Sequence, residues 1–476
     1  MDFHNVNCIM LTYFPKFFSS RAIICYGLTL LLASMLFLDH AMPLQFMLFG
    51  IGYVMVFFVY ANRLTMDWNR LPVVSFGKKL FITALIIRIV YVILIYFYYV
   101  GMTGEPHAYH PGDELLYDGM AALWKDQGFD EFRNQMKQYI GFSDSGYCWW
   151  LAIEYKLLGT HVLPARILKC FFDAYTCVLL YKMAQRSFGE TVGRMAAIFY
   201  MLIPNAWFYC GVTLKETEMV FLTVLFVERA DFVLRSPKIK ITGIVIPALC
   251  ILVMFTFRTA LAAVMFASLA AGLIFTSAKQ LQAWKKIIYS AVFAIWMFLT
   301  VGVEIVQETQ QLWEGRITNQ EVGMEWRSNR VGGNQFAKYA SATLFAPAIF
   351  TIPFSSMVEI PNQENQMMLN GANFIKNILS GFVLFALFSF LISGEWRKYV
   401  LPIALMCGYL IVLVFSNFAQ SERFHFPILA LELMFAAYGV SQMKNKHKRW
   451  FMIWLVAMCL ANIGWAWIKL AGRGMA

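Results

Sequence analysis

Charged residues are scarce in this chain. Asp, Glu, Lys and Arg together make up 14% of its 476 residues, whereas 60% are hydrophobic and the mean hydropathy is +0.59. A soluble globular protein of this length has too little interior to hide so much apolar surface. The composition therefore excludes a soluble fold and predicts a polytopic membrane protein.

Cysteine motifs and a cleavable signal are also missing. The nine cysteines include no CxxC pair and no His/Cys cluster, and most lie within apolar runs, so we expect packing residues rather than disulfides or metal ligands. The first apolar run, 22–38, has no convincing cleavage site, which favours a retained span. The net charge of +11 does not predict nucleic-acid binding, because in a membrane protein the placement of basic residues matters more than their sum.

Apolar runs long enough to cross a bilayer as helices recur along the whole chain. About thirteen are expected, each near the usual length of ~20 residues. They lie at 22–38, 43–61, 80–100, 165–184, 195–212, 217–234, 241–256, 259–276, 287–303, 373–392, 400–416, 424–440 and 450–470. The predicted fold class is all-α, a single multi-pass domain over 1–476 in which 22–61 form an N-terminal helix pair.

Basic residues are concentrated in every second loop between these runs. By the positive-inside rule those loops are cytoplasmic, which places the N-terminus inside and the C-terminus outside. The basic residues of this set are Arg63, Arg70, Lys78, Lys79, Arg186, Arg194, Arg235, Lys238, Lys240, Lys279, Lys285, Lys286, Arg397, Lys398, Lys444, Lys446, Lys448 and Arg449. The alternate loops are acidic or mixed, and two of them, 101–161 and 304–372, are large.

The first large outside loop contains HPGDELLYDGMAALW at 110–124. Pro111 and Gly112 interrupt the preceding structure, and Asp113 is expected to cap a helix that follows. Glu114 and Asp118 are four residues apart and should share one face of that helix. Its helix-like pieces, 114–126 and 147–158, are too short to span a bilayer and are expected to lie along its surface.

In the second large loop, the apolar stretch 342–356 is broken by Pro347 and Pro353. A span interrupted in this way is predicted to be a re-entrant or interfacial segment.

Several charged residues at helix ends fall on the same predicted side as Asp113. They are Lys215, Glu216, Arg258, Glu422, Arg423 and His425. Each has a structural explanation when taken singly: basic residues at helix ends reach toward headgroups, acids pair with neighbouring cations, and histidine can be an interfacial ring. As a set they offer carboxylates to accept a proton and cations to hold a phosphate.

The order of several segments resembles the GT-C superfamily of polytopic glycosyltransferases. The similarity is greatest to bacterial relatives of protein O-mannosyltransferases and lipid A aminoarabinose transferases, of the glycosyltransferase family 39 type. The segments are GDELLYDGMAALWKDQG (112–128), GYCWWLAIEYKLLG (146–159), 165–216, which ends in LKE, and SERFHFPILALELMFAAYG (421–439). Two differences are the helix pair at 22–61, which precedes the acidic loop, and Cys148 and Trp149, which follow the Gly–Tyr pair where a proline is usual.

The resemblance implies transfer of a sugar from a polyprenyl-phosphate donor to an acceptor hydroxyl on a glycan, lipid or protein. It implies a bacterial inner (plasma) membrane and an extracytoplasmic active site. Asp113 would be the catalytic base, with Glu114 second, in an inverting displacement. Lys215, Arg258 and Arg423 would bind the lipid phosphate, with His425 as a hydrogen-bond donor. The remaining substrate-binding candidates are Tyr117, Asp118, Glu216 and Glu422.

Two other functions stay open. A polysaccharide polymerase or ligase would use polyprenyl-diphosphate-linked glycans and needs a similar outside loop with basic groups. A lipid or glycan transporter or flippase would place charged residues near mid-span and show an internal repeat. No cofactor is certain: the carboxylates could bind a divalent cation, but no ligand spacing argues for a metal site.

Overall fold

The computed structural model describes residues 11–128, 131, 142–236, 241–275, 310, 314 and 316–475. Within these residues the regular elements are helices, and Ala41 and Val358 form an isolated β-bridge. The α-helices are α1 Lys16–Leu36, α2 Leu44–Asp67, α3 Val73–Thr103, α4 Gly112–Trp124, α6 Phe142–Leu158, α7 Val162–Phe188, α8 Glu190–Leu202, α9 Pro204–Cys210, α10 Glu216–Arg235, α11 Ile241–Phe257, α12 Thr259–Phe275, α14 Arg316–Asn329, α15 Ala342–Phe345, α16 Glu364–Met368, α17 Asn370–Ser393, α18 Val400–Val414, α19 Glu422–Ser441 and α20 Lys448–Ala471. The predicted all-α class is confirmed for this part of the chain.

Seven of the described helices are long and apolar enough to cross a membrane, so the protein is membrane-embedded. They are α1, α2, α3, α17, α18, α19 and α20. Helices α11 and α12 are apolar but shorter. The expected total of about thirteen spans stays a prediction, and the one expected at 287–303 lies outside the described residues. The span expected at 195–212 is two helices, α8 and α9, because Pro204 lacks the N–H that would continue α8.

A pair of opposite charges lies buried inside the bundle. Arg88 of α3 and Asp173 of α7 are fully buried and form an ion pair, and Asp173 also accepts a hydrogen bond from the Tyr200 hydroxyl. The Arg88 guanidinium further donates to the carbonyls of Tyr200 and Met201 at 3.3 Å. A buried charge is tolerated only with such partners, so this pair fixes α3, α7 and α8 against one another.

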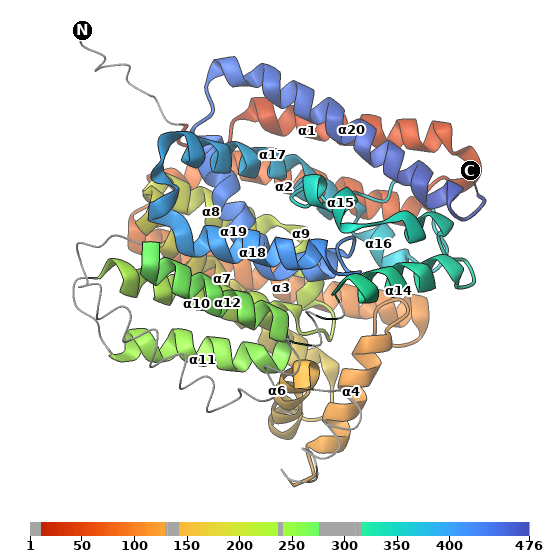
Figure 1. The fold of residues 1–476 in the computed structure, drawn as a ribbon, viewed down its shortest axis with the longest axis horizontal. Coiled ribbons are helices and arrows are strands. Elements are labelled where there is room, and N and C mark those ends of the chain that lie inside the picture. Colours follow the sequence, from red (N-terminus) through yellow and green to blue (C-terminus); the bar gives the residue numbers. More distant parts are fainter. Residues whose placement is uncertain are drawn as a thin grey trace.

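The loops gather at two ends of the bundle, in agreement with the charge pattern of the sequence. At one end Arg186 pairs with Glu228 at 2.5 Å and with Asp231 at 3.3 Å. At the other end lie α4, α6, α14, α15 and α16, on the same side of the molecule as the C-terminus (Figure 1). This second end, predicted to be extracytoplasmic, carries the acidic loop.

Two helices of the first large loop pack beside this end. They are α4 and α6, close to the expected pieces at 114–126 and 147–158, and the rings of Tyr117 and Tyr147 meet at 5.2 Å between centroids. The prediction that Asp113 caps α4 is wrong: Pro111 is the N-cap residue, and Asp113 lies in the first turn. Because Asp113 does not bond to the helix terminus, its carboxylate is available for contacts outside α4.

The stretch 342–356 of the second large loop is only partly helical. It contains α15 and a 3-10 turn, Ala346–Ala348, and then continues without regular structure through Pro353. Its later part packs against α17, where the Asn377 amide donates to the Pro353 carbonyl at 3.0 Å. The stretch therefore does not form a membrane-spanning helix. Its placement relative to a bilayer stays a prediction.

Candidate functional site

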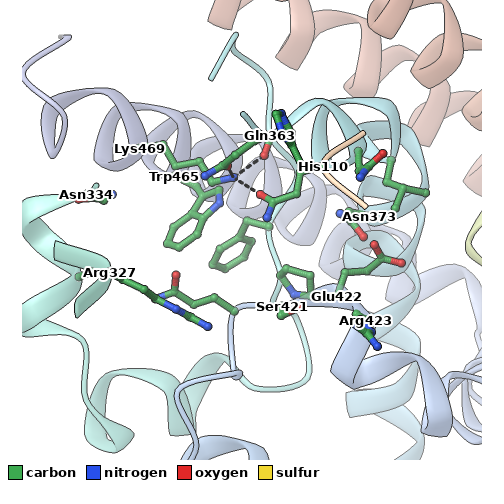
Figure 2. A pocket seen from close by; sticks show the side chains of 18 of the residues that line it. His110, Arg327, Asn334, Gln363, Asn373, Ser421, Glu422, Arg423, Trp465 and Lys469 are labelled. Atoms are coloured by element: carbon green, nitrogen blue, oxygen red, sulfur yellow. Dashed lines mark hydrogen bonds between the residues drawn. The ribbon is translucent and has the colours of Figure 1, made fainter. Parts of the chain in front are cut away.

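A cavity of about 840 Å³ lies at the loop-rich end of the bundle. Its walls come from five parts of the chain that are distant in sequence: 108–114, 208–214, 326–373, 420–423 and 465–473. Figure 2 shows Arg327 and Asn334 on one side of the cavity and Glu422 and Arg423 on the opposite side. The cavity is therefore completed only when both large loops and the ends of α19 and α20 come together.

Asp113 lies on the cavity wall with its side chain 54% exposed. Its carboxylate accepts a hydrogen bond from Nη1 of Arg423, whose Nε donates to the buried Glu216. One guanidinium thus serves two carboxylates and cannot by itself supply excess positive charge to a ligand. The arrangement holds Asp113 at the cavity surface, where it can accept a proton from a bound group.

Glu114, although it lines the cavity, is held on several sides. Its carboxylate accepts hydrogen bonds from the backbone N–H of Thr213 at 2.8 Å, from the N–H of Ala108 at 3.2 Å and from Arg166 at 3.2 Å. Burial would raise the pKa of Glu114, but His107, Arg166 and the Thr213 N–H outweigh burial and lower it. Glu114 therefore holds the loop in place through these hydrogen bonds, and Asp113 is better placed to act as a base.

His107, which the sequence analysis missed, lies buried between two acids of α4. Its Nε2 is 3.5 Å from Asp118 Oδ2, and its Nδ1 is 3.9 Å from Glu114 Oε2. Asp118 first, and Glu114 second, raise the pKa of His107 to about 9. Asp118 also accepts from the Tyr155 hydroxyl, and its pKa is lowered because these bonds outweigh its burial. The predicted shared face of Glu114 and Asp118 is confirmed, and the His107 ring lies against it.

Tyr117 and Asp118 do not line the cavity. Tyr117 is buried against Tyr147, and Asp118 faces His107 and Tyr155 behind the wall. Both residues support α4, which carries Asp113. Their predicted contact with substrate would need a rearrangement of this helix.

Three other predicted residues also lie outside the cavity lining. Buried Lys215 donates to Asp144 and to the Phe257 carbonyl at 2.5 Å; burial first and Arg258 second lower its pKa to about 8. The Arg258 guanidinium donates to the Tyr409 hydroxyl at 3.2 Å and stacks 4.1 Å from the centre of the Phe424 ring. His425 is buried, with Nε2 2.8 Å from the Ala419 carbonyl. These contacts join α6, α10, α11, α18 and α19.

Glu422 does line the cavity, next to Arg423. Its carboxylate accepts a hydrogen bond from the Asn205 amide at 2.6 Å. The structure thus brings Asp113, Glu114, Glu422 and Arg423 to the cavity surface, and it places Glu216 immediately behind Arg423.

Four basic residues on other walls of the cavity were not predicted to bind substrate. They are Arg327, Arg330, Lys469 and Arg473, which we call the cationic wall. None of them forms an ion pair with an acid in the described part of the chain. A signal was present in the sequence: Lys469 and Arg473 end the last apolar run on the predicted outer side, where basic residues are expected to be few.

No protein-family model matches this chain, and no curated protein sequence matches it. The chemistry must therefore come from the geometry. Among the described residues, no group of three or more His, Cys, Asp and Glu side chains could hold a metal ion. The cavity offers a proton acceptor at Asp113, basic residues that form no ion pair within the described ranges, and aromatic surface such as Trp465 beside Lys469. This combination suits an anionic ligand that also carries an apolar face.

Proposed function

We propose that this protein is a membrane glycosyltransferase, which moves a sugar from a polyprenyl-phosphate-linked donor to an acceptor hydroxyl at this cavity. The observation that carries the proposal is the half-exposed Asp113 carboxylate, which Arg423 fixes on the wall of a cavity of about 840 Å³. The cavity lies at the end of a bundle of apolar helices. A lipid-linked donor can place its headgroup there while its tail stays in the bilayer.

In this mechanism Asp113 is the general base. The acceptor hydroxyl attacks the anomeric carbon, a new carbon–oxygen bond forms, and the bond from that carbon to the phosphate oxygen breaks. The hydroxyl proton passes to Asp113, and the lipid phosphate leaves with the bonding electrons. One such displacement inverts the anomeric centre. Arg423 has the role of aiming the carboxylate, because its own charge is shared between Asp113 and Glu216.

The resemblance of the sequence to GT-C glycosyltransferases supports the same reaction and an extracytoplasmic site in a bacterial plasma membrane. A glycan, a lipid or a protein side chain would each supply the hydroxyl. Membrane lipid is the expected surrounding of the helix bundle, in accord with its seven long apolar helices.

The test is transfer of radiolabelled sugar from a panel of polyprenyl-linked donors by the full chain in lipid nanodiscs. Asp113→Asn removes the proton acceptor and is expected to slow transfer by roughly 10²- to 10⁴-fold. Asp126→Asn is the matched control, because Asp126 follows α4, is exposed and does not line the cavity. Normal transfer by a folded Asp113→Asn protein would remove Asp113 from this role.

A polymerase or ligase that uses polyprenyl-diphosphate-linked glycans is the second candidate. The observation that favours it is the cationic wall, which carries more positive charge than a single phosphate diester balances.

A transporter or flippase is the third candidate. A protein of this class is expected to have charged residues within its membrane-spanning helices. Lys376 of α17 and Glu432 of α19 are such a pair, buried, with 3.6 Å between Nζ and Oε2. Uptake of a labelled lipid-linked glycan without any transfer product would favour this candidate.

A further inference from the structure

The cationic wall combines four basic residues from two parts of the chain. Arg327 and Arg330 lie at the end of α14 and just after it, and Lys469 and Arg473 lie at the end of α20 and just after it. Arg473 ties the two parts together by donating to the Gly332 carbonyl at 3.1 Å and to the Lys469 carbonyl at 2.7 Å. The four residues therefore form one surface of the cavity.

Lys469 organises the neutral groups beside it. Its ammonium donates to Ser356 Oγ at 2.6 Å, to Gln366 Oε1 at 2.8 Å and to Gln363 Oε1 at 3.1 Å (Figure 2). Because an ammonium group can only donate, both glutamine oxygens must face it and both NH₂ groups must point away. Neither NH₂ group has a hydrogen-bond acceptor among the described residues, and both glutamines line the cavity. They are unused donors at the surface of the cavity.

The arginines of the wall are incompletely bonded. The side chains of Arg327 and Arg330 form no hydrogen bond within the described ranges, and they only stack on the rings of Phe418 and Trp326. Burial first, and the charge of Arg330 second, lower the pKa of both Arg327 and Arg473. Cations that repel one another in this way gain stability when an anion binds among them.

We infer that the cationic wall binds the diphosphate of a polyprenyl-diphosphate-linked donor, with the glutamine NH₂ groups and the arginine guanidinium groups as its hydrogen-bond donors. A sugar on a single lipid phosphate carries one negative charge, whereas a sugar on a lipid diphosphate carries two. The second matches the three guanidinium groups of the wall better. This inference rests on the proposed function and replaces the monophosphate donor of that proposal by a diphosphate.

Equilibrium binding to the full chain in nanodiscs tests the inference. The probes are radiolabelled undecaprenyl diphosphate, undecaprenyl monophosphate and undecaprenol, with inorganic pyrophosphate as competitor. We expect the diphosphate to bind at least about tenfold more tightly than the monophosphate, and undecaprenol to bind most weakly, because each charge-assisted hydrogen bond contributes roughly a factor of ten. If pyrophosphate competes, the anion alone is recognised. If pyrophosphate does not compete but the diphosphate still binds more tightly than the monophosphate, the lipid is needed too.

The variants Arg330→Gln and Gln363→Leu are each expected to weaken diphosphate binding, the first by about tenfold. Arg330 is exposed and stacks on the exposed ring of Trp326, so its replacement removes a surface contact and no buried one. Lys338→Gln is the matched control, because Lys338 is exposed in the same loop, carries the same charge and does not line the cavity. Equal affinity for monophosphate and diphosphate, or unchanged binding in Arg330→Gln, would overturn the inference.

This outcome is separable from the fate of the proposed function. Asp113→Asn is expected to keep diphosphate binding, since Asp113 is not part of the cationic wall. If the diphosphate preference is absent but transfer still depends on Asp113, only the inference about the diphosphate is refuted. If the diphosphate binds but Asp113→Asn transfers sugar normally, only the role of Asp113 as general base is refuted.

Discussion

The imidazolium of His107 should make the attachment of α4 depend on pH near neutrality. His107 is 5% exposed and lies between Asp118 and Glu114, and these acids raise its pKa from 6.5 to about 9. A raised pKa in the folded state means that the stabilisation is complete below pH 6.5 and is lost as the pH rises through about 9. Arg166 and Tyr155 also face these two acids.

The size of the effect follows from the two pKa values. Linkage gives about 3 kcal/mol at pH 6, about 1.4 kcal/mol at pH 8 and about 0.4 kcal/mol at pH 9. These are upper values, because the 3.9 Å between His107 Nδ1 and Glu114 Oε2 is too long for a hydrogen bond. Between pH 6 and pH 8 the opening equilibrium of α4 should therefore shift by up to about 20-fold.

Hydrogen exchange of the α4 amides, corrected for intrinsic rates, measures this opening. Burial raises the pKa of Glu154 in α6 to about 8, so stability attributed to Glu154 also falls as the pH rises toward 8. His107→Gln keeps the Glu154 contribution and removes that of His107, so the difference between the two proteins isolates His107. An equal loss of protection in both proteins would refute the reasoning.

Three further predictions concern ion pairs. Arg423→Leu leaves Glu216, 1% exposed, without its counterion and should lower the free energy of unfolding by about 3–5 kcal/mol, measured by thermal unfolding; no shift would contradict the pairing. Arg88→Leu should cost a similar ~3–5 kcal/mol, and the double variant with Asp173→Leu should regain most of it, because the lone buried charge is then gone. Lys215→Met should lower the melting temperature without changing donor affinity in the binding assay, since Lys215 does not line the cavity; weaker binding by an equally stable variant would place it in the site.

Local sequence pattern was enough for several features of this protein. The spacing of Glu114 and Asp118 predicted one shared helix face, and the break at Pro111 and Gly112 predicted the start of a helix, because both depend on neighbours within a few residues. Charge alternation predicted which loops gather at the same end. Asp113 was expected to act as a cap but instead bonds to Arg423.

Side-chain direction was not predictable in the same way. Lys215 and Arg258 share the correct end of the bundle, yet Asp144 and Tyr409 hold them away from the cavity. The cationic wall depends on contacts between α14 and α20, such as that of Arg473 with Gly332, and no local pattern encodes these contacts. The predicted side of the membrane limits which residues can line the same cavity. The packing of the helices decides which of those residues do line it.

The pairing of Asp113 with Arg423 also has a consequence for synthesis in the cell. The two residues are 310 positions apart, and the brace from Glu114 to the Thr213 N–H spans 99 positions. At about 5–20 residues per second, the ribosome needs on the order of 15 to 60 seconds after making Asp113 before it makes Arg423. During that interval α4 has been made but Arg423 has not, so Asp113 has no ion-pair partner while later helices enter the bilayer. The site is thus assembled near the end of translation, and a nascent chain released before α19 has no Arg423 to hold Asp113 in place.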